Sequence, residues 1–456
     1  MSTHLETVPL APGALPGIGH LGRLARDPLG FFERLRAHGP LVRIRLAHRT
    51  VYVVSSAELV HHVLVTGRAD YDKGGPVMDT LRALLGNGMP MQSDALQHVQ
   101  RPLIQPAFHR DRMPDYIRRL TAYVEKHIAG WEAGQVLDGS AEMSDLITAS
   151  LTLSLFTDPV SARAAIRFKS DLPIILSGLA LRAALPVAAR LPLPANLRYN
   201  RAAHRTHTAI DTILRHRQDH PGHHDDLLTM FLAARNGLDA KADDEQTRAD
   251  ILGFMTAGIE TTADLLGWTL HVLTTRPDLY QSVQNEIDTV LDGSPPAYQD
   301  LPRLSQLHQV VTEVLRFHPP VWLLSRITRR PAELGGHTLP PDADIVFSIS
   351  ALHRDPAVFP DPGRFDPSRW QPGRTTRAQK AGFLPFGVGA RKCIGDVFGM
   401  AEVTSTLVVM LQHYRIRLAP GSKVTPRADM TLRPVGLRLL IEPRTVRTPV
   451  QQKDPA

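Results

Sequence analysis

The sequence predicts a mainly α-helical protein with a minor β region, and two features support that prediction. Residues 113–235 show helical spacing of apolar residues with few breaks, and residues 247–275 form the longest helical pattern. Short strand-like runs occur at 41–46, 50–54, 343–350, 414–418 and 437–441. Neither an internal repeat nor a linker divides the 456 residues, so we expect a single domain over 1–456.

Composition limits the classes of protein to which the chain can belong. Hydrophobic residues make up 43% of it and charged residues 21%, which suffices for a large globular core. A single cysteine excludes an intrachain disulfide and suits a reducing compartment. The sequence holds no run of about eighteen apolar residues, so we expect a soluble, cytoplasmic monomer without a membrane anchor.

The chain is basic, with 52 Lys and Arg residues against 45 Asp and Glu residues and a net charge of +7. Aromatic residues are few and no block of Lys and Arg stands out, so we do not expect a nucleic-acid-binding protein. An ordinary basic surface is the simplest interpretation of this charge. The more useful hypothesis is a basic face that receives an acidic protein partner.

The N-terminal part alternates between short elements. We expect, in order, an irregular lead-in at 10–20, a helix at 28–38, paired strands at 41–46 and 50–54, and helices at 57–65 and 96–108. Residues 74–93 are rich in Gly, Met and Pro and only weakly periodic, which predicts mainly a loop. Residues 204–224 hold many histidines, but their spacing fits no compact metal site, and Pro221-Gly222 would interrupt a helix. We therefore expect a polar loop there as well.

The long helix at 247–275 carries the first candidate site. Its residues are apolar on nearly all sides from Ile251 to Leu273, which predicts a helix buried through the core. At its centre, Gly258 weakens the helix by about 1 kcal/mol relative to alanine, and Glu260 places a costly carboxylate in the interior. A glycine in mid-helix and a carboxylate in the interior both cost stability, and two such costs within one turn indicate a functional site.

Thr261 adds a hydroxyl to this turn. Ala257 and Gly258 lie one turn before it on the same face, so their small side chains leave space there. The Thr261 hydroxyl can donate to the carbonyl of residue 257 and open the helix locally. Packing alone would also explain a threonine in mid-helix, and Glu260 could simply pair with a Lys or Arg residue.

The chain's only cysteine, Cys393, lies in a glycine-rich loop at 383–395. An apolar, helix-like pattern follows from Val397, so Cys393 comes just before a helix begins. Unpaired N–H groups and the positive end of the helix dipole favour a thiolate there, and a thiolate is a strong ligand for iron. A buried, apolar cysteine is the alternative interpretation, and for a lone cysteine it is the commoner one.

The residues around Cys393 decide between these alternatives. The string Phe-Gly-x-Gly-x-Arg-x-Cys-x-Gly at 386–395 closely resembles the haem-thiolate loop of the cytochrome P450 family. The string Ala-Gly-x-Glu-Thr-Thr at 257–262 resembles the oxygen-activation motif of the same family. The resemblance covers about 10–443 and implies the cytochrome P450 fold, a single domain that holds haem b through the Cys393 thiolate.

The resemblance also implies the haem contacts. Phe386 would shield the sulfur from water, and Gly387 and Gly395 would allow the tight turns of the loop. The haem propionates would be bound by Arg101, Arg326 and Arg391. The family usually has Trp or His four residues before the first of these arginines. Here that residue is Gln97, and either it or its neighbour His98, the candidate we name, would contact the haem.

Catalytic and pocket residues follow from the same resemblance. Glu260 and Thr261 would be catalytic and deliver protons to bound oxygen. Ala257 and Gly258 would border the groove that holds this oxygen. The substrate pocket would be lined by Phe254, Met255, Val321, Trp322 and Leu323, and Thr431 would close it from the other side.

A scaffolding network is implied by a Glu-x-x-Arg string. Taken alone, Glu313 and Arg316 form an ordinary i,i+3 surface pair worth a few tenths of a kcal/mol. In the family, an arginine from a later Pro-x-Arg-Phe segment joins this pair and the network is buried. Here that residue would be Arg364, and the network would hold the cysteine loop.

The activity implied is that of a monooxygenase. No flavin or iron–sulfur domain is fused to the chain, so a ferredoxin and a ferredoxin reductase would supply electrons, docking beside Arg391 and Lys392. The segments Leu-Pro-Ala-Asn at 193–196 and Val-Trp-Leu-Leu at 321–324 resemble those of terpene-oxidising members. This predicts a terpenoid substrate in secondary metabolism, such as antibiotic biosynthesis. A fatty acid or a macrolide is the alternative substrate. The alternative functions are a haem-thiolate peroxygenase or isomerase and a non-catalytic ligand-binding homologue.

Overall fold

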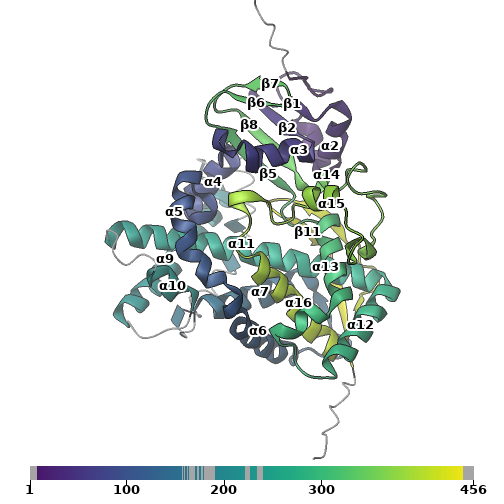
Figure 1. Ribbon diagram of the computed structural model, residues 1–456. Helices are drawn as coiled ribbons and strands as arrows, with labels where there is room; N and C mark the ends of the chain where they lie inside the picture. Colours follow the sequence, from purple (N-terminus) through teal and green to yellow (C-terminus); the bar gives the residue numbers. More distant parts are fainter. Residues whose placement is uncertain are drawn as a thin grey trace, which may run out of the picture.

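A computed structural model describes residues 8–156, 191–220, 226–233 and 240–444, together with scattered residues between 158 and 178. It shows a large helical body with small sheets, of which the largest lies at one end (Figure 1). The prediction of a mainly α-helical fold is confirmed. Within the described ranges, no helix combines the length and the apolar composition needed to cross a bilayer.

The largest sheet joins segments that are far apart in the sequence. Its strand order is β1-β2-β8-β5-β3. The strands are β1 (Leu41–Leu46), β2 (Arg49–Val54), β3 (Tyr71–Asp72), β5 (Leu323–Thr328) and β8 (Asp344–Ser348). Strand β2 pairs in parallel with β8, with Val51 opposite Asp344. The N-terminal hairpin, the expected strand near 345 and strand β5 therefore form one unit.

Helices α2 (Pro28–Leu35) and α3 (Ala57–His61) lie beside this sheet (Figure 1). The Asp27 side chain accepts a hydrogen bond from Gly30 N–H at 3.0 Å and so caps α2. The helix expected at 57–65 is present, but its second half widens into a π-helical turn at His62–Thr66.

Three smaller sheets complete the β region. They consist of β4 (Val136–Asp138) with β12 (Arg438–Pro443) and β9 (Tyr414–Leu418), β10 (Thr425–Ala428) with β11 (Leu432–Val435), and β6 (Ala332–Leu334) with β7 (His337–Leu339). The β10–β11 hairpin packs on the long central helix, where Trp268 Nε1 donates to the Leu432 carbonyl at 2.8 Å. This contact brings the hairpin tip beside the predicted catalytic turn.

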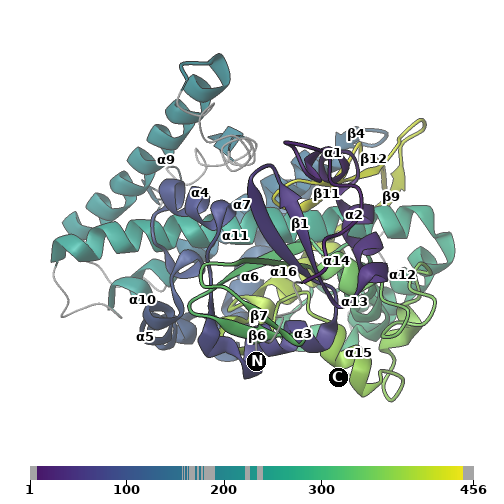
Figure 2. The ribbon, with the colours of Figure 1, turned by 90° about the horizontal axis from the view of Figure 1, so that it is seen from above.

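Helix α11 (Ala240–Thr275) runs through the middle of the molecule (Figure 2). It begins at Ala240 rather than at the expected residue 247 and ends where predicted. Its neighbours are α7 (Gly139–Leu155), α9 (Pro194–Asp219), α13 (Ser305–Phe317) and α16 (Asp396–His413). The remaining long helices are α6 (Met113–Ile128) and α12 (Pro277–Leu291), and α10 (Leu227–Ala233) is shorter. The all-round apolar pattern therefore did indicate a core helix.

Two predicted loops are wrong. Residues 74–93 contain helix α4 (Pro76–Leu85), whose buried Leu81 and Leu85 lie one turn apart, and Gly86 ends it with φ 73°. The histidine-rich segment is helical to Asp219 because α9 continues through it, with Ile210 and Ile213 buried. Residues 221–225 lie outside the described residues. In the described ranges, no group of three His, Cys, Asp or Glu side chains could hold a metal ion.

The predicted scaffolding pair is fully buried in helix α13. Arg316 donates to both carboxylate oxygens of Glu313, at 2.9 and 2.7 Å. Its other guanidinium hydrogens go to three carbonyls, those of His353 at 3.1 Å, Pro362 at 2.9 Å and Arg364 at 3.0 Å. The three bonds to these carbonyls thus link α13 to the segment that precedes the cysteine loop.

The third member of this network is Arg369, and the prediction of Arg364 is wrong. The Arg364 side chain is exposed, and only its backbone carbonyl takes part. Arg369 Nε lies 3.5 Å from a Glu313 carboxylate oxygen, and Trp370 Nε1 donates to the other oxygen at 2.8 Å. The Pro-x-Arg-aromatic pattern occurs twice, at 362–365 and 367–370, and the second copy is the one that folds over Glu313.

We predict that Arg369→Ala lowers the free energy of unfolding by about 1–3 kcal/mol, because it removes a buried partner of Glu313. It also removes hydrogen bonds to the Pro360 and Asp361 carbonyls at 2.6 and 2.8 Å. Arg364→Ala is the matched control and should change stability by less than about 0.5 kcal/mol. Denaturant unfolding of both variants measures this. A larger loss for Arg364→Ala would restore the original assignment.

Candidate active site

The loop that carries Cys393 is built from glycine turns and one backbone bond. Cys393 N–H donates to the Phe386 carbonyl at 2.8 Å, which closes the loop on itself. Gly387 and Gly389 have φ of 67° and 73°, which a side chain would strain. A Cβ on Gly389 would also stand 2.7 Å from the Leu64 carbonyl, so glycine is required for this close approach.

His353 ties this loop to the buried network of α13. Its Nε2 accepts from Leu384 N–H at 2.9 Å, and its Nδ1–H donates to the Arg316 carbonyl at 3.2 Å. Burial, aided by the charge of Arg316, lowers the pKa of His353 to about 3, so the ring is neutral. A neutral ring can donate a hydrogen bond from one nitrogen and accept one at the other. The loop is therefore held by the same residues that hold Glu313 and Arg316.

The Cys393 thiol is accessible and lies just before helix α16, as expected. Burial raises its pKa, whereas the Gly395 N–H and the charges of Arg101 and Lys392 lower it and Asp396 raises it. Burial thus outweighs the Gly395 N–H, which lowers the thiol pKa as expected of a helix start. A metal ion bound to the sulfur would remove the proton directly.

Buried cations next to the loop need an anionic partner. Arg326 is 7% exposed and, among the described residues, lies in no ion pair. It donates a hydrogen bond to the carbonyl of the preceding residue, Ser325, at 2.7 Å. Burial and the nearby Arg391 lower its pKa to about 10. Lys73 donates to the Pro90 carbonyl at 2.5 Å, and burial together with Arg326 and Arg391 lowers its pKa to about 7. Unpaired buried cations suit the carboxylates of haem propionates.

Arg391 already has carboxylate partners. Its Nε donates to Asp94 at 2.5 Å, one terminal nitrogen donates to the Gln92 carbonyl at 2.6 Å, and Asp72 lies at 3.5 Å. The guanidinium of Arg391 is paired with two acids of the chain itself, and its contact with a propionate stays a prediction. Lys73, which the sequence motifs did not indicate, is a second candidate beside Arg326 for binding a propionate.

Helix α5 (Asp94–Ile104) clamps the cysteine loop from the other side. Arg101 donates to the carbonyls of Lys392 at 2.7 Å and Ala390 at 3.2 Å. Gln97, one turn earlier, is buried and donates to the Ala390 carbonyl at 3.4 Å. The neighbouring His98 is exposed, so Gln97 is the residue that meets the loop, and the prediction of His98 is wrong.

The centre of α11 has the hydrogen bond that the sequence predicts. Thr261 Oγ1 donates to the Ala257 carbonyl at 2.7 Å. Ala257 is exposed, whereas Ile259 is fully buried, so Ala257 and Thr261 share an open side of the helix. Gly258 has a different role from the expected one, because a Cβ there would stand 2.9 Å from a Leu151 methyl. Its missing side chain lets α7 pack closely on α11.

The Glu260 carboxyl faces the β10–β11 hairpin. Burial raises its pKa, while the Arg433 charge and the Thr431 hydroxyl lower it and Asp429 raises it. The alternative that Glu260 pairs with a basic residue stays a prediction, because Arg433 is itself ion-paired with Asp429 at 2.9 Å. These residues come from the segment 429–433, where the sequence analysis expected only a pocket wall.

The predicted pocket residues fall into two groups. Met255 is fully buried, and Trp322 packs on Phe32 with ring centroids 6.1 Å apart and donates to the Asp429 carbonyl at 2.9 Å. Both are buried in core clusters, and their place in the substrate pocket stays a prediction. Val321 and Leu323 are partly exposed, as alternation along an extended segment requires, and remain pocket candidates.

The other two candidates are largely buried. Phe254 is 8% exposed and lies against Phe108, with ring centroids 5.7 Å apart. Thr431 is 7% exposed and lies beside the acids of α11.

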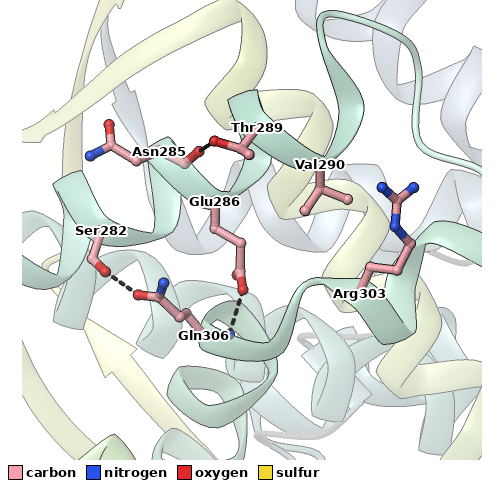
Figure 3. Close-up of a pocket in the computed structure, with 7 residues that line it drawn as sticks. All are labelled: Ser282, Asn285, Glu286, Thr289, Val290, Arg303 and Gln306. Atoms are coloured by element: carbon pink, nitrogen blue, oxygen red, sulfur yellow. Dashed lines mark hydrogen bonds between the residues drawn. The ribbon is translucent and has the colours of Figure 1, made fainter.

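The pocket in Figure 3 is unrelated to this site. It has a volume of about 370 Å³ and lies between α12 and the start of α13. Glu286 in its wall accepts hydrogen bonds from Ser305 Oγ and from the backbone N–H groups of Gln306 and Leu307. Glu286 therefore caps α13, which is a structural role.

Comparisons with known proteins agree with this arrangement. The family model described as "Cytochrome P450" matches residues 9–443. Cyclooctatin synthase of Streptomyces melanosporofaciens is 40% identical over 439 residues, which cover 95% of this chain and 95% of that protein. Pentalenene oxygenase of Streptomyces avermitilis is 38% identical over 454 residues, 99% of this chain and 100% of that protein. Cyclooctat-9-en-7-ol 5-monooxygenase of S. melanosporofaciens is 37% identical over 441 residues, 96% of each chain.

We predict that Arg326→Met speeds the loss of haem, because it removes a buried cation that we expect to pair with a propionate. The rate of haem transfer to apomyoglobin measures this. Arg364→Met, a change at an exposed arginine, is the control and should leave the rate unchanged. An unaltered rate for Arg326→Met would show that its charge serves another partner.

Proposed function

Because the chain belongs to the cytochrome P450 family, we propose that this haem-dependent monooxygenase oxidises an apolar terpenoid. The observation that carries the substrate class is the full-length match to three relatives. Their names refer to cyclooctatin, to pentalenene and to cyclooctat-9-en-7-ol. A place in secondary metabolism, such as the biosynthesis of an antibiotic, is part of the same proposal.

Haem b, bound through Cys393, would supply the activation of dioxygen and the oxidation of a C–H bond. The accessible thiol, closed loop and buried cations of the site fit this group. Lys73 and Arg326 would bind the propionates. Arg101 and Gln97 would hold the loop by its carbonyls, at the distances given above.

The chain's own residues would hold and transfer protons on the open side of α11. The Thr261 hydroxyl, held by the Ala257 carbonyl at 2.7 Å, keeps one fixed orientation. Its oxygen lone pairs remain free to accept a hydrogen bond and pass on a proton. Glu260, with a raised pKa, would hold an exchangeable proton on the same turn.

Electrons would come from a separate redox protein, which we propose to be a ferredoxin served by a ferredoxin reductase. The side chain of Arg391 is 7% exposed and ion-paired, so it cannot form the docking surface that was expected there. Lys392 is 51% exposed and pairs with Asp396 within one turn. An acidic partner would therefore meet Lys392 at the surface of the loop. A monomer in the cytoplasm fits this arrangement.

Substrate class can be tested by binding spectra of the ferric enzyme. Terpenoid hydrocarbons and alcohols should shift the Soret band of the haem-loaded enzyme toward the high-spin form. Fatty acids and macrolides form the comparison panel and should shift it less. A saturable shift with a fatty acid or a macrolide, and none with any terpenoid, would overturn the proposed substrate class.

Thr261→Ala should uncouple NAD(P)H consumption from product formation, because general acid–base groups contribute roughly a hundredfold. Hydrogen peroxide should rise as product falls. Thr262→Ala is the matched control, since the Thr262 hydroxyl faces Gly399 of α16. The measurement is NAD(P)H, peroxide and product for each variant with one accepted substrate. Full coupling in Thr261→Ala would remove its hydroxyl from the proton path.

A further inference from the structure

A second buried carboxyl, that of Asp264, follows Glu260 by one turn of α11. Residues four apart lie on the same face of a helix, so both side chains meet the tip of the β10–β11 hairpin. Asp264 is 6% exposed, and its Oδ2 has no hydrogen-bond partner among the residues that the structure describes. No role in the proposed function uses this acid.

Unpartnered polar atoms gather around it. Thr431 Oγ1 and Arg433 Nε are buried and, like Asp264 Oδ2, form no hydrogen bond of normal geometry. The Thr431 hydroxyl nevertheless lies close to the carboxyls of both Glu260 and Asp264. An acid, a hydroxyl and a guanidinium N–H around one point are the setting in which a buried water binds.

The charges that face Asp264 come from two elements. Glu260 lies on its own helix, and Asp429 and Arg433 lie on the hairpin. Asp429 is paired with Arg433 at 2.9 Å and with Arg427 at 2.8 Å, so the hairpin charges largely compensate one another. Burial raises the pKa of Asp264 well above its usual value, Glu260 and Asp429 raise it further, and Thr431 and Arg433 oppose this. These surroundings favour the neutral form of the acid.

These polar groups of α11 and the hairpin also connect the interior with solvent. The side chains of Arg433 and Asp429 are 32% and 33% exposed, whereas Asp264 and Thr431 are nearly inaccessible. A chain of polar groups thus runs from the surface of the hairpin to Glu260. Each member lies beside the next.

We propose that Asp264 and Thr431, with a bound water, connect Glu260 to solvent at the β10–β11 hairpin, and that Asp264 is a positioning residue for Glu260. When Glu260 gives up its proton, the neutral acid passes one to the Glu260 carboxylate through the hydroxyl or the water. It takes one proton back from the solvent side, so each carboxyl ends as it began. This inference rests on the proposed role of Glu260.

Infrared spectroscopy of the resting holoenzyme, without substrate, tests the connection. The carbonyl stretch of a protonated carboxyl should be present at neutral pH and disappear in Asp264→Asn. In Glu260→Gln this band should titrate at lower pH, because the Glu260 charge that raises the pKa of Asp264 is gone. Thr431→Val should shift the frequency of the band, and Thr431→Ser, which keeps the hydroxyl, should restore it.

Glu402 provides a matched control. It is a buried acid on α16, bonded to Ser150 Oγ at 2.5 Å, and burial raises its pKa to about 8. Glu402→Gln should remove a different band and leave the titration of the Asp264 band unchanged. An Asp264 band that titrates identically in the wild type and in Glu260→Gln would overturn the proposal, as would its absence from the wild type.

Turnover gives a second, independent readout. Asp264→Asn and Thr431→Val should lower turnover by roughly tenfold and enlarge the solvent isotope effect, with Thr431→Ser close to the wild type. Glu402→Gln should leave the isotope effect unchanged. The infrared results do not depend on the substrate, so they would stand if the terpenoid proposal failed. Unchanged isotope effects in both variants would contradict the connection.

Discussion

The buried ion pair of Glu313 and Arg316 is the interaction on which the active site depends. Neither side chain has access to solvent, and removing one partner of such a pair costs about 3–5 kcal/mol. Arg316 binds the His353 carbonyl, and His353 in turn accepts from Leu384 at the start of the cysteine loop. The position of the only cysteine is therefore set by a chain of hydrogen bonds that begins in α13, with no direct contact to the sulfur.

Charge is distributed differently on the two sides of this site. Beside the cysteine loop, Arg326 is buried and Lys73 is partly buried, and their pKa values fall to about 10 and about 7. On the turn of α11, Glu260 and Asp264 are buried acids whose pKa values are raised. The first arrangement suits the binding of an anionic cofactor, and the second suits the storage of protons. Both cost stability, which is typical of functional sites.

Local motifs could be predicted from the sequence, whereas contacts between distant segments could not. The Thr261 bond to residue 257 depends on helix geometry alone, and it is present. Arg364 and Arg369 occupy equivalent places in two copies of one pattern, and only folding shows which copy is buried over Glu313. Alternation along the extended segment puts Trp322 in the core. Lys73 carries no recognisable motif, and Gln97 departs from the residue types usual at its motif position, so their roles emerge only from the fold.

The central claim is that the Cys393 thiolate binds haem iron in a loop held by the α13 network. The most direct measurement is the absorption spectrum of the reduced, carbon-monoxide-bound protein. The wild type should show the red-shifted Soret band of haem-thiolate proteins, and Cys393→Ala should lose this band together with monooxygenase activity. A Cys393→Ala protein that keeps the band would contradict the account.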